Sequence, residues 1–362
     1  MAPNPPDDAA PSDRNQPAAA VPPAAAPSAP GSPRAQQVLF GDRGAMARLM
    51  RDLDDNIAGA AEDLAWLYPR TGRAFVAGVT GMPGVGKSTL VAGLIGHYRA
   101  AGAQVGVVAV DPSSPFSGGA LLGDRVRMQQ HTTDEGVFIR SLATRGQLGG
   151  LSRSTADVVS VLDAAGFQRV VVETVGVGQA EVDVMTAVDV VVVVTAPGLG
   201  DEVQALKSGI LEIADVLVVN KADREGAGRA VKDLTTMLEL AHRAGAGRAP
   251  GDAGVPVLET VATAGTGVAD LIEVIDRVRS TIPERRAARR RRQVEAQLLA
   301  ISGQLARVEL TRLLGTADAP GPLAHLLDEV TARHRDPTSA ARELLAALAA
   351  PLRSPPPSAG EG

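Results

Sequence analysis

The chain has 362 residues, of which 45% are hydrophobic and only 2% aromatic, so its core must be built from the aliphatic residues that buried parallel strands use. It contains no cysteine, which excludes a disulfide framework, a thiolate metal site and a cysteine nucleophile. The formal net charge of −5 and the lack of a long uninterrupted apolar run predict a cytoplasmic protein that binds neither nucleic acid nor a membrane.

The composition of the chain changes near residue 37. Residues 1–36 are mostly Pro, Ala, Ser and Asp and cannot offset the entropy of ordering, so we predict a disordered tail. Apolar residues then recur at steps of three and four from Met46 to Leu67, behind Asp42 as a candidate N-cap. This pattern predicts one amphipathic helix within a helical extension over residues 37–72.

Next come a predicted strand over residues 74–80, a glycine-rich loop and a helix that ends near residue 101. The loop, GMPGVGKS, fits the pattern G-x-x-x-x-G-K-S, in which backbone N–H groups and a helix N-terminus face a phosphate. We expect Lys87 to reach the β- and γ-phosphates and the Ser88 hydroxyl to ligate Mg²⁺. The predicted nucleotide-binding residues here are Gly81, Gly84, Val85, Gly86, Lys87, Ser88 and Thr89.

Strands and helices continue to alternate up to residue 283. Continuous valine-rich strands separated by helix-length segments are typical of a parallel sheet that is covered on both faces. The further strands are expected at 105–110, 136–142, 169–174, 188–196, 214–221 and 255–260, with a helix over 152–165. We therefore predict the α/β fold class: a P-loop NTPase over residues 73–283, with a mostly parallel central sheet flanked by helices and with N- and C-terminal helical extensions.

Acidic residues at or near strand ends are candidate metal ligands, because Mg²⁺ prefers oxygen ligands and ligands collect at the carboxyl ends of parallel strands. Asp111 ends the strand VGVVAVD, Asp124 lies in GALLGDRVRM, and Glu173 ends VVE. We predict that these three acids and Ser88 form the metal shell, with Asp124 and Glu173 also acting as switch residues.

The segment ETVGVGQ resembles the D-x-x-G switch with Glu in place of Asp. Gly176 would offer its backbone N–H to a γ-phosphate, so the segment can order with the triphosphate and relax after hydrolysis. Lys87, Glu173 and Gln179 are the candidate catalytic residues. Because Gln179 lies three residues beyond Gly176 and not directly after it, we expect slow intrinsic turnover.

The segment VLVVNKAD indicates which base the nucleotide carries. Asn220, Lys221 and Asp223 follow a buried strand, and the Asp223 carboxylate can pair with the N1–H and N2–H₂ donors of guanine. Against adenine the same carboxylate would be desolvated and unpaired. The sequence therefore predicts GTP and GDP as the bound nucleotides.

After residue 283 the strands stop, and residues 284–352 form a predicted helical arm followed by a disordered tail over 353–362. Apolar residues at steps of four and three leave two interpretations open, a helix packed on its own domain or a dimerisation arm; these residues are Val294, Leu298, Ile301, Leu305 and Val308. Six arginines among residues 285–292 favour a solvated helix face or a partner contact over RNA, because no aromatic residue lies nearby to stack on bases. The five histidines are scattered and none is assigned a metal.

Several long blocks of the sequence closely resemble the methylmalonyl-CoA mutase-associated GTPases, the MeaB/ArgK family of P-loop GTPases. These blocks are VDPSSPFSGGALLGDRVRM, FIRSLATRGQLGGLS, VVETVGVGQAEVDV and APGLGDEVQALKSGI, and the likeness runs from about residue 40 to about residue 290. The resemblance implies a GTP-hydrolysing chaperone of an adenosylcobalamin-dependent acyl-CoA mutase, which gates cofactor loading and protects or reactivates the mutase.

The resemblance also implies roles for individual residues. The loop from Pro197 to Lys207 would be an additional switch, GTP or GDP with Mg²⁺ the cofactors, and the C-terminal extension the contact of a homodimer. The family's T-S-A near the base reads Thr260, Val261 and Ala262 here, so only the Ala262 backbone N–H is expected to meet the guanine carbonyl.

Two other classes of protein with a phosphate loop of this kind are alternatives, namely nickel-insertion GTPases and P-loop kinases. A nickel-insertion GTPase would carry His-rich or Cys-containing metal sites, and this chain has no cysteine and no His-rich tract. A P-loop kinase would need an acceptor site with a base, and no such constellation is visible. The sequence does not name the client mutase.

Overall fold

The structure, a computed structural model, describes residues 30–111, 131, 133–143, 150–174, 185, 188–198, 213–243, 254–281, 283–315 and 320–353. Its centre is a seven-stranded sheet in the order β3-β2-β4-β1-β5-β6-β7. The strands are β1 (Phe75–Gly81), β2 (Val105–Asp111), β3 (Val137–Ala143), β4 (Arg169–Thr174), β5 (Val190–Thr195), β6 (Val216–Asn220) and β7 (Val257–Thr260). Each ladder between these strands is parallel, which confirms the predicted sheet.

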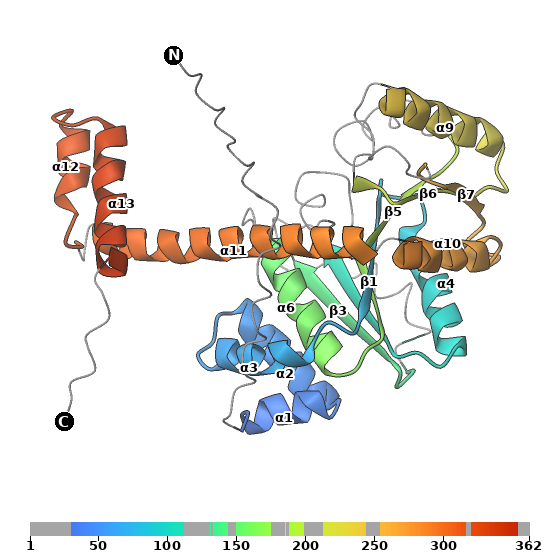
Figure 1. Cartoon of the computed structure of the whole chain (residues 1–362), viewed down its shortest axis with the longest axis horizontal. Coiled ribbons are helices and arrows are strands. Elements are labelled where there is room, and N and C mark those ends of the chain that lie inside the picture. The colour runs from blue at the N-terminus through green and yellow to red at the C-terminus, as the bar shows by residue number, and fades with distance from the viewer. Residues whose placement is uncertain are drawn as a thin grey trace, which may run out of the picture.

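Helices cover both faces of this sheet (Figure 1). One face packs against α4 (Lys87–Ala100) and α10 (Val268–Thr281), and the other against α6 (Gly150–Ala164) and α9 (Ala227–Arg243). Neighbouring residues of a strand alternate between the two cores: Val171 faces α4, whereas Val170 and Val172 face α6. The valine runs are continuous because both faces of each strand are buried.

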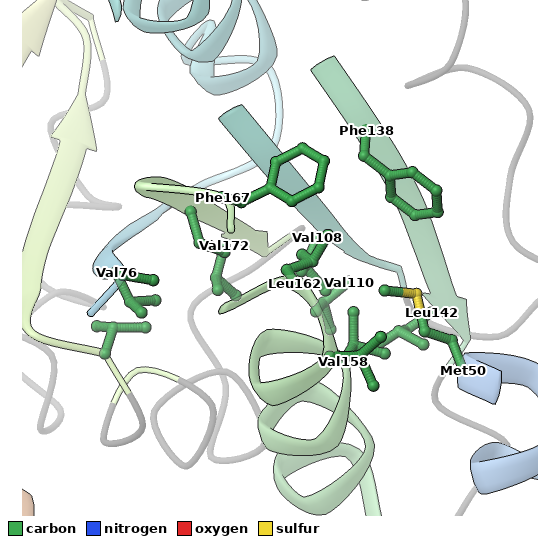
Figure 2. Close-up of a cluster of buried hydrophobic side chains, with 14 of the residues drawn as sticks. Met50, Val76, Val108, Val110, Phe138, Leu142, Val158, Leu162, Phe167 and Val172 are labelled. Carbon is green, nitrogen blue, oxygen red and sulfur yellow. The ribbon is translucent and has the colours of Figure 1, made fainter. Parts of the chain in front are cut away.

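The core between α6 and the sheet is shown in Figure 2. Val158 and Leu162 of α6 lie against Val108 and Val110 of β2 in this cluster. At its edge, the rings of Phe138 and Phe167 meet edge to face, with centroids 6.2 Å apart and planes at 70°. This is one of the geometries that aromatic rings prefer.

The N-terminal extension is helical, as predicted, but it is not one helix. It consists of α1 (Pro33–Leu39), α2 (Arg43–Asp54), α3 (Ala60–Leu67) and a short 3₁₀ turn, η1 (Tyr68–Arg70). Asp42 is the N-cap of α2, and its side chain accepts the backbone N–H of Ala45 at 2.6 Å. All three helices contact α6, and Met50 of α2 reaches the core shown in Figure 2.

The predicted single helix over Met46 to Leu67 is therefore wrong. The chain leaves the helical conformation after Asp54 and re-enters at Ala60, preceded by Gly59 with φ of 83°. Leu49 and Leu53 of α2 and Leu67 of α3 are all buried in the same core. Two helices that face one core keep the apolar spacing of a single helix, so periodicity alone did not show the break. The described chain also enters its first helix at Pro33, before the predicted boundary at residue 37.

The C-terminal part begins with α11 (Pro283–Leu314), a helix of 32 residues. It extends away from the sheet and carries α12 (His325–Thr331) and α13 (Pro337–Arg353) at its far end (Figure 1). The predicted helical arm is confirmed. Among the described residues, no helix has the combination of length and apolarity that crossing a bilayer requires.

Candidate nucleotide-binding site

The phosphate loop joins β1 to α4 at the carboxyl edge of the sheet, with glycines where a side chain would not fit. Gly81, Gly84 and Gly86 have φ values of 146°, 80° and 96°, which L-residues with side chains rarely adopt. A Cβ on Gly81 would lie 2.1 Å from the Val194 carbonyl oxygen, and one on Gly86 would lie 2.4 Å from the Asn220 amide nitrogen. The loop is therefore a closely packed backbone cradle in front of a helix N-terminus, the arrangement that binds phosphates.

Lys87 lies inside this cradle at the first position of α4. Its side chain is buried, and its ammonium group donates to the carbonyl oxygens of Gly81 at 2.8 Å and Met82 at 3.0 Å. These are the backbone atoms that lead into the loop, so the cation is held at the loop where the sequence predicts a phosphate. Val85 is buried, and Thr89 is half-buried in the first turn of α4.

Ser88, next to Lys87 in the sequence, brings its side-chain oxygen into contact with that of Glu173. The Ser88 hydroxyl, on α4, donates to a carboxylate oxygen of Glu173, on β4, at 2.6 Å, and both side chains are buried. A hydroxyl and a carboxylate next to a phosphate loop form a donor set that fits Mg²⁺, which takes few protein oxygens and completes its shell with water and phosphate. Two of the predicted metal-shell residues therefore lie in contact, and their binding of a metal stays a prediction.

Asp111 is the last residue of β2, in register with Ala143 of β3 and two residues beyond Ala109, which pairs with Glu173. Its backbone therefore ends at the same edge of the sheet as Glu173, as the sequence predicted. The side chain of Asp111 and the predicted residues Asp124, Gly176, Gln179 and Lys207 lie outside the described residues. Pro197 is described, half-buried in the turn after β5.

Asn220 ties the phosphate loop to the strand ends on the side expected for the base. Its amide nitrogen donates to the Val85 carbonyl oxygen at 2.9 Å, and its amide oxygen accepts the Thr260 hydroxyl and the Ala262 backbone N–H, both at 3.1 Å. Asn220 is therefore a buried connector between β6, β7 and the loop. The Ala262 N–H, expected at a guanine carbonyl, donates to Asn220 here, and its contact with guanine stays a prediction.

Lys221, which follows β6, also contacts the phosphate loop. It has φ of 58°, and its ammonium group donates to the Gly84 carbonyl oxygen at 2.6 Å. Asp223 is exposed in the turn that follows, where a base in solution could approach it. The sequence placed both residues at the nucleotide but did not predict that Lys221 supports the loop.

Sequence reasoning also missed two buried threonines at the strand ends. Thr80 in β1 and Thr174 at the end of β4 are each 0% exposed. The signal was available, because each threonine stands directly beside a motif residue or at the end of a valine-rich strand. In the described part of the chain, no group of three or more His, Cys, Asp or Glu residues could hold a metal ion.

Comparison with known proteins identifies the family. Residues 46–313 match the family described as methylmalonyl Co-A mutase-associated GTPase MeaB. A putative GTPase from Pyrococcus horikoshii is 49% identical over 270 residues, which cover 74% of this chain and 84% of that protein. The methylmalonic aciduria type A homolog of mouse mitochondria is 40% identical over 172 residues, 47% of this chain and 41% of that protein.

A solved structure titled LAO/AO transport system kinase has the same fold. It superposes with a TM-score of 0.62 and 24% identity over 87% of this chain and 96% of that one. The phosphate loop, the Ser88–Glu173 pair and the Asn220 connector thus occur in a chain whose sequence matches this family over most of its length. The protein belongs to the MeaB family of methylmalonyl Co-A mutase-associated GTPases and is itself a P-loop GTPase.

Proposed function

We propose that this GTPase binds GTP or GDP with Mg²⁺ and uses the difference between them to regulate an adenosylcobalamin-dependent acyl-CoA mutase. The observation that carries the proposal is the family match over residues 46–313, whose described part contains the Ser88–Glu173 pair at 2.6 Å. The name of the family supplies the partner class. The client is thus a mutase that acts on methylmalonyl-CoA or a related acyl-CoA.

The chain's own residues divide the work at the nucleotide. Lys87 would exchange its carbonyl contacts for phosphate oxygens, and Ser88 and Glu173, with Asp111 and Asp124, would hold Mg²⁺, which neutralises charge on the phosphates. Asp223 would pair with guanine beside the connector Asn220. Gly176 and the loop from Pro197 to Lys207 would respond to the γ-phosphate, and Gln179 would orient water.

We further propose a homodimer that forms through α11. Four residues of the predicted apolar stripe are exposed: Val294, Leu298, Leu305 and Val308, with exposed fractions of 36–64%. A row of exposed aliphatic side chains along one helix favours a partner surface over a solvated one. The contacts of α11 with α6, α10 and α13 leave this row uncovered in the described chain.

The chaperone role is tested by mixing the protein with purified candidate mutases and adenosylcobalamin. We expect the GTP-bound and GDP-bound forms to change the rate of cofactor transfer to the apo-mutase by different factors, and the mutase to change the rate of GTP hydrolysis. A mutase that alters neither rate, tested across methylmalonyl-CoA and isobutyryl-CoA enzymes, would remove the assignment. The Ser88→Ala variant lacks the hydroxyl of the proposed metal pair. It serves as the control for whether the difference between the GTP-bound and GDP-bound forms depends on that pair.

A further inference from the structure

Two buried threonines join the phosphate loop to the strand that carries Glu173. Thr80 immediately precedes Gly81, Thr174 immediately follows Glu173, and both are 0% exposed. The Thr174 hydroxyl donates to the Thr80 hydroxyl at 2.9 Å. Since neighbouring residues of a strand point to opposite faces, the pair lies on the α6 side of the sheet, whereas Glu173 meets Ser88 on the α4 side.

The hydroxyl pair lies just beyond the point where β1 and β4 stop pairing through their backbones. The last register pair of these strands is Val79 with Glu173. Beyond this pair, β1 continues only alongside β5, and the last register pair there is Gly81 of β1 with Val194 of β5. β4 continues only alongside β2, and the last register pair there is Thr174 of β4 with Val110 of β2. Within the described part of the chain, the bond from Thr174 to Thr80 thus extends the connection between the two strands by one residue.

We propose that Thr80 is a positioning residue for the metal pair: through Thr174 it holds the end of β4 against β1 and so sets the Glu173 carboxylate relative to Ser88. The proposal rests on the Mg²⁺ role proposed above for Ser88 and Glu173. Its physical basis is that the buried Thr174 hydroxyl has a strong preference for one geometry, because without its bond to Thr80 it would be desolvated and unpaired. One side of this pair belongs to the chain entering the phosphate loop, and the other to the chain leaving Glu173.

The test replaces hydroxyls without changing shape. Thr80→Val and Thr174→Val each remove the bond, Thr80→Ser keeps it, and Thr155→Val is the matched control. Thr155 is also 0% exposed, on α6, and its hydroxyl has no hydrogen-bond partner among the described residues. The measurement is the release rate of a fluorescent GDP analogue from the full-length protein as a function of Mg²⁺ concentration, which does not depend on hydrolysis.

We expect both valine variants to raise the Mg²⁺ concentration for half-maximal slowing of release about fivefold, the ratio that follows from losing one ordinary hydrogen bond. Release in EDTA should be unchanged. Thr80→Ser and Thr155→Val should both behave as wild type.

Glu173→Gln separates this proposal from the metal assignment itself. If Glu173→Gln leaves the Mg²⁺ dependence unchanged, the role proposed for Glu173 is wrong. If Glu173→Gln shifts the Mg²⁺ dependence but neither threonine-to-valine variant does, the positioning role of Thr80 is wrong. It is also wrong if the control Thr155→Val shifts the Mg²⁺ dependence as much as Thr80→Val does. Should one valine variant fail to fold, the other removes the same bond and decides the question.

Discussion

At the scale of single residues, buried or half-buried aspartates hold the starts of strands, at the end of the sheet away from the phosphate loop. Asp163, at the end of α6, accepts the backbone N–H groups of Gly72, Arg73 and Ala74 at 2.5, 3.2 and 3.0 Å. Asp189 and Asp215 accept the N–H groups of Val76 and Val191 in the same way. These carboxylates satisfy donors that would otherwise be buried at the entry into the sheet. Asp163 also attaches the N-terminal extension to α6 where the chain enters β1.

Replacing Asp163 tests this attachment. We expect Asp163→Ala to lower the free energy of unfolding by about 3 kcal/mol, because several buried N–H groups lose their acceptor. Asp163→Asn keeps one acceptor oxygen and should lower the free energy of unfolding by less. Chemical denaturation measures both, with Asp233→Ala as the control: Asp233 is exposed on α9 and should change stability by less than about 0.5 kcal/mol. A loss for Asp163→Ala no larger than for Asp233→Ala would contradict the account.

The choice of base is also decided by one residue. Asp223→Asn should weaken GTP binding and improve binding of xanthosine triphosphate, whose ring has an oxygen where guanine has an amine. Isothermal titration with both nucleotides measures the preference, and exposed Glu225, two residues further along, gives the matched control Glu225→Gln. A preference unchanged by Asp223→Asn would mean that the carboxylate does not contact the base.

At the scale of elements, the N-terminal extension shows how a backbone break can be hidden in an apolar pattern. The turn between α2 and α3 contains two residues with positive φ, Asn56 at 52° and Gly59 at 83°. Gly59 precedes α3, and nothing lies within 4 Å of a Cβ built on it. The glycine is therefore required by its backbone conformation and not by space.

This distinction predicts opposite effects for two alanine substitutions. Gly59→Ala should destabilise the protein by about 1 kcal/mol, because an L-residue is strained at this φ. Gly96→Ala should stabilise it by up to about 1 kcal/mol, because Gly96 lies inside α4, is exposed and equally has open space for a Cβ. Thermal denaturation of both variants checks the signs, and the same sign for both would exclude backbone conformation as the cause.

Acid should loosen the N-terminal extension before the sheet. Arg34 donates to Asp52 and Asp63, each at 2.6 Å, and so ties α1 to α2 and α3. The hydrogen bond from Arg51, and the charges of Arg51 and Arg34, hold the pKa of Asp52 below its usual range. A depressed folded-state pKa gives stability that is complete above the unfolded pKa of about 4 and is lost as pH falls through the folded value.

Trp66 reports this transition, since it is the only tryptophan of the chain and lies in α3 with the Arg70 guanidinium 3.7 Å from its ring centroid. Fluorescence of the wild type should change as the pH falls below about 4, the unfolded pKa of an aspartate. Asp52→Asn, which cannot titrate, should flatten that part of the curve. An identical curve for both proteins would remove Asp52 as the titrating group.

At the scale of the whole molecule, α11 is the element that leaves the domain. It carries α12 and α13 away from the sheet while keeping contact with α6 and α10 (Figure 1). α6 in turn packs against the N-terminal helices and the sheet. Both helical extensions therefore contact the same helix of the nucleotide-binding domain.

Dimerisation through α11 is tested by two neighbouring leucines. Leu298→Arg places a charge in the apolar stripe, whereas Leu299→Arg places it one residue further, turned by about 100° on the helix. Both leucines are exposed, at 60% and 69%, so folding should tolerate either change. Analytical ultracentrifugation should show a monomer for Leu298→Arg and the wild-type state for Leu299→Arg. A wild-type monomer, or equal effects of both changes, would contradict the proposed interface.

The sequence alone determined the sheet, because valine runs buried on both faces leave few other structures. It also determined the phosphate loop, whose glycines have no alternative at φ of 146° and 96° in a space already filled by neighbouring atoms. The motifs at the ends of parallel strands also placed Ser88 and Glu173 in one predicted site, where the two side chains meet. They assigned Asn220 to the base, and its bond to the phosphate loop was not predicted.

Only the tertiary structure decided which polar groups meet behind those motifs. Asp163 is 89 residues or more from its backbone partners, and Thr174 is 94 residues from Thr80. Such pairs depend on strand order and register, and local periodicity contains neither. The break between α2 and α3 was also invisible to local periodicity. Both helices turn their apolar residues toward one core, so the spacing of these residues continues across the break.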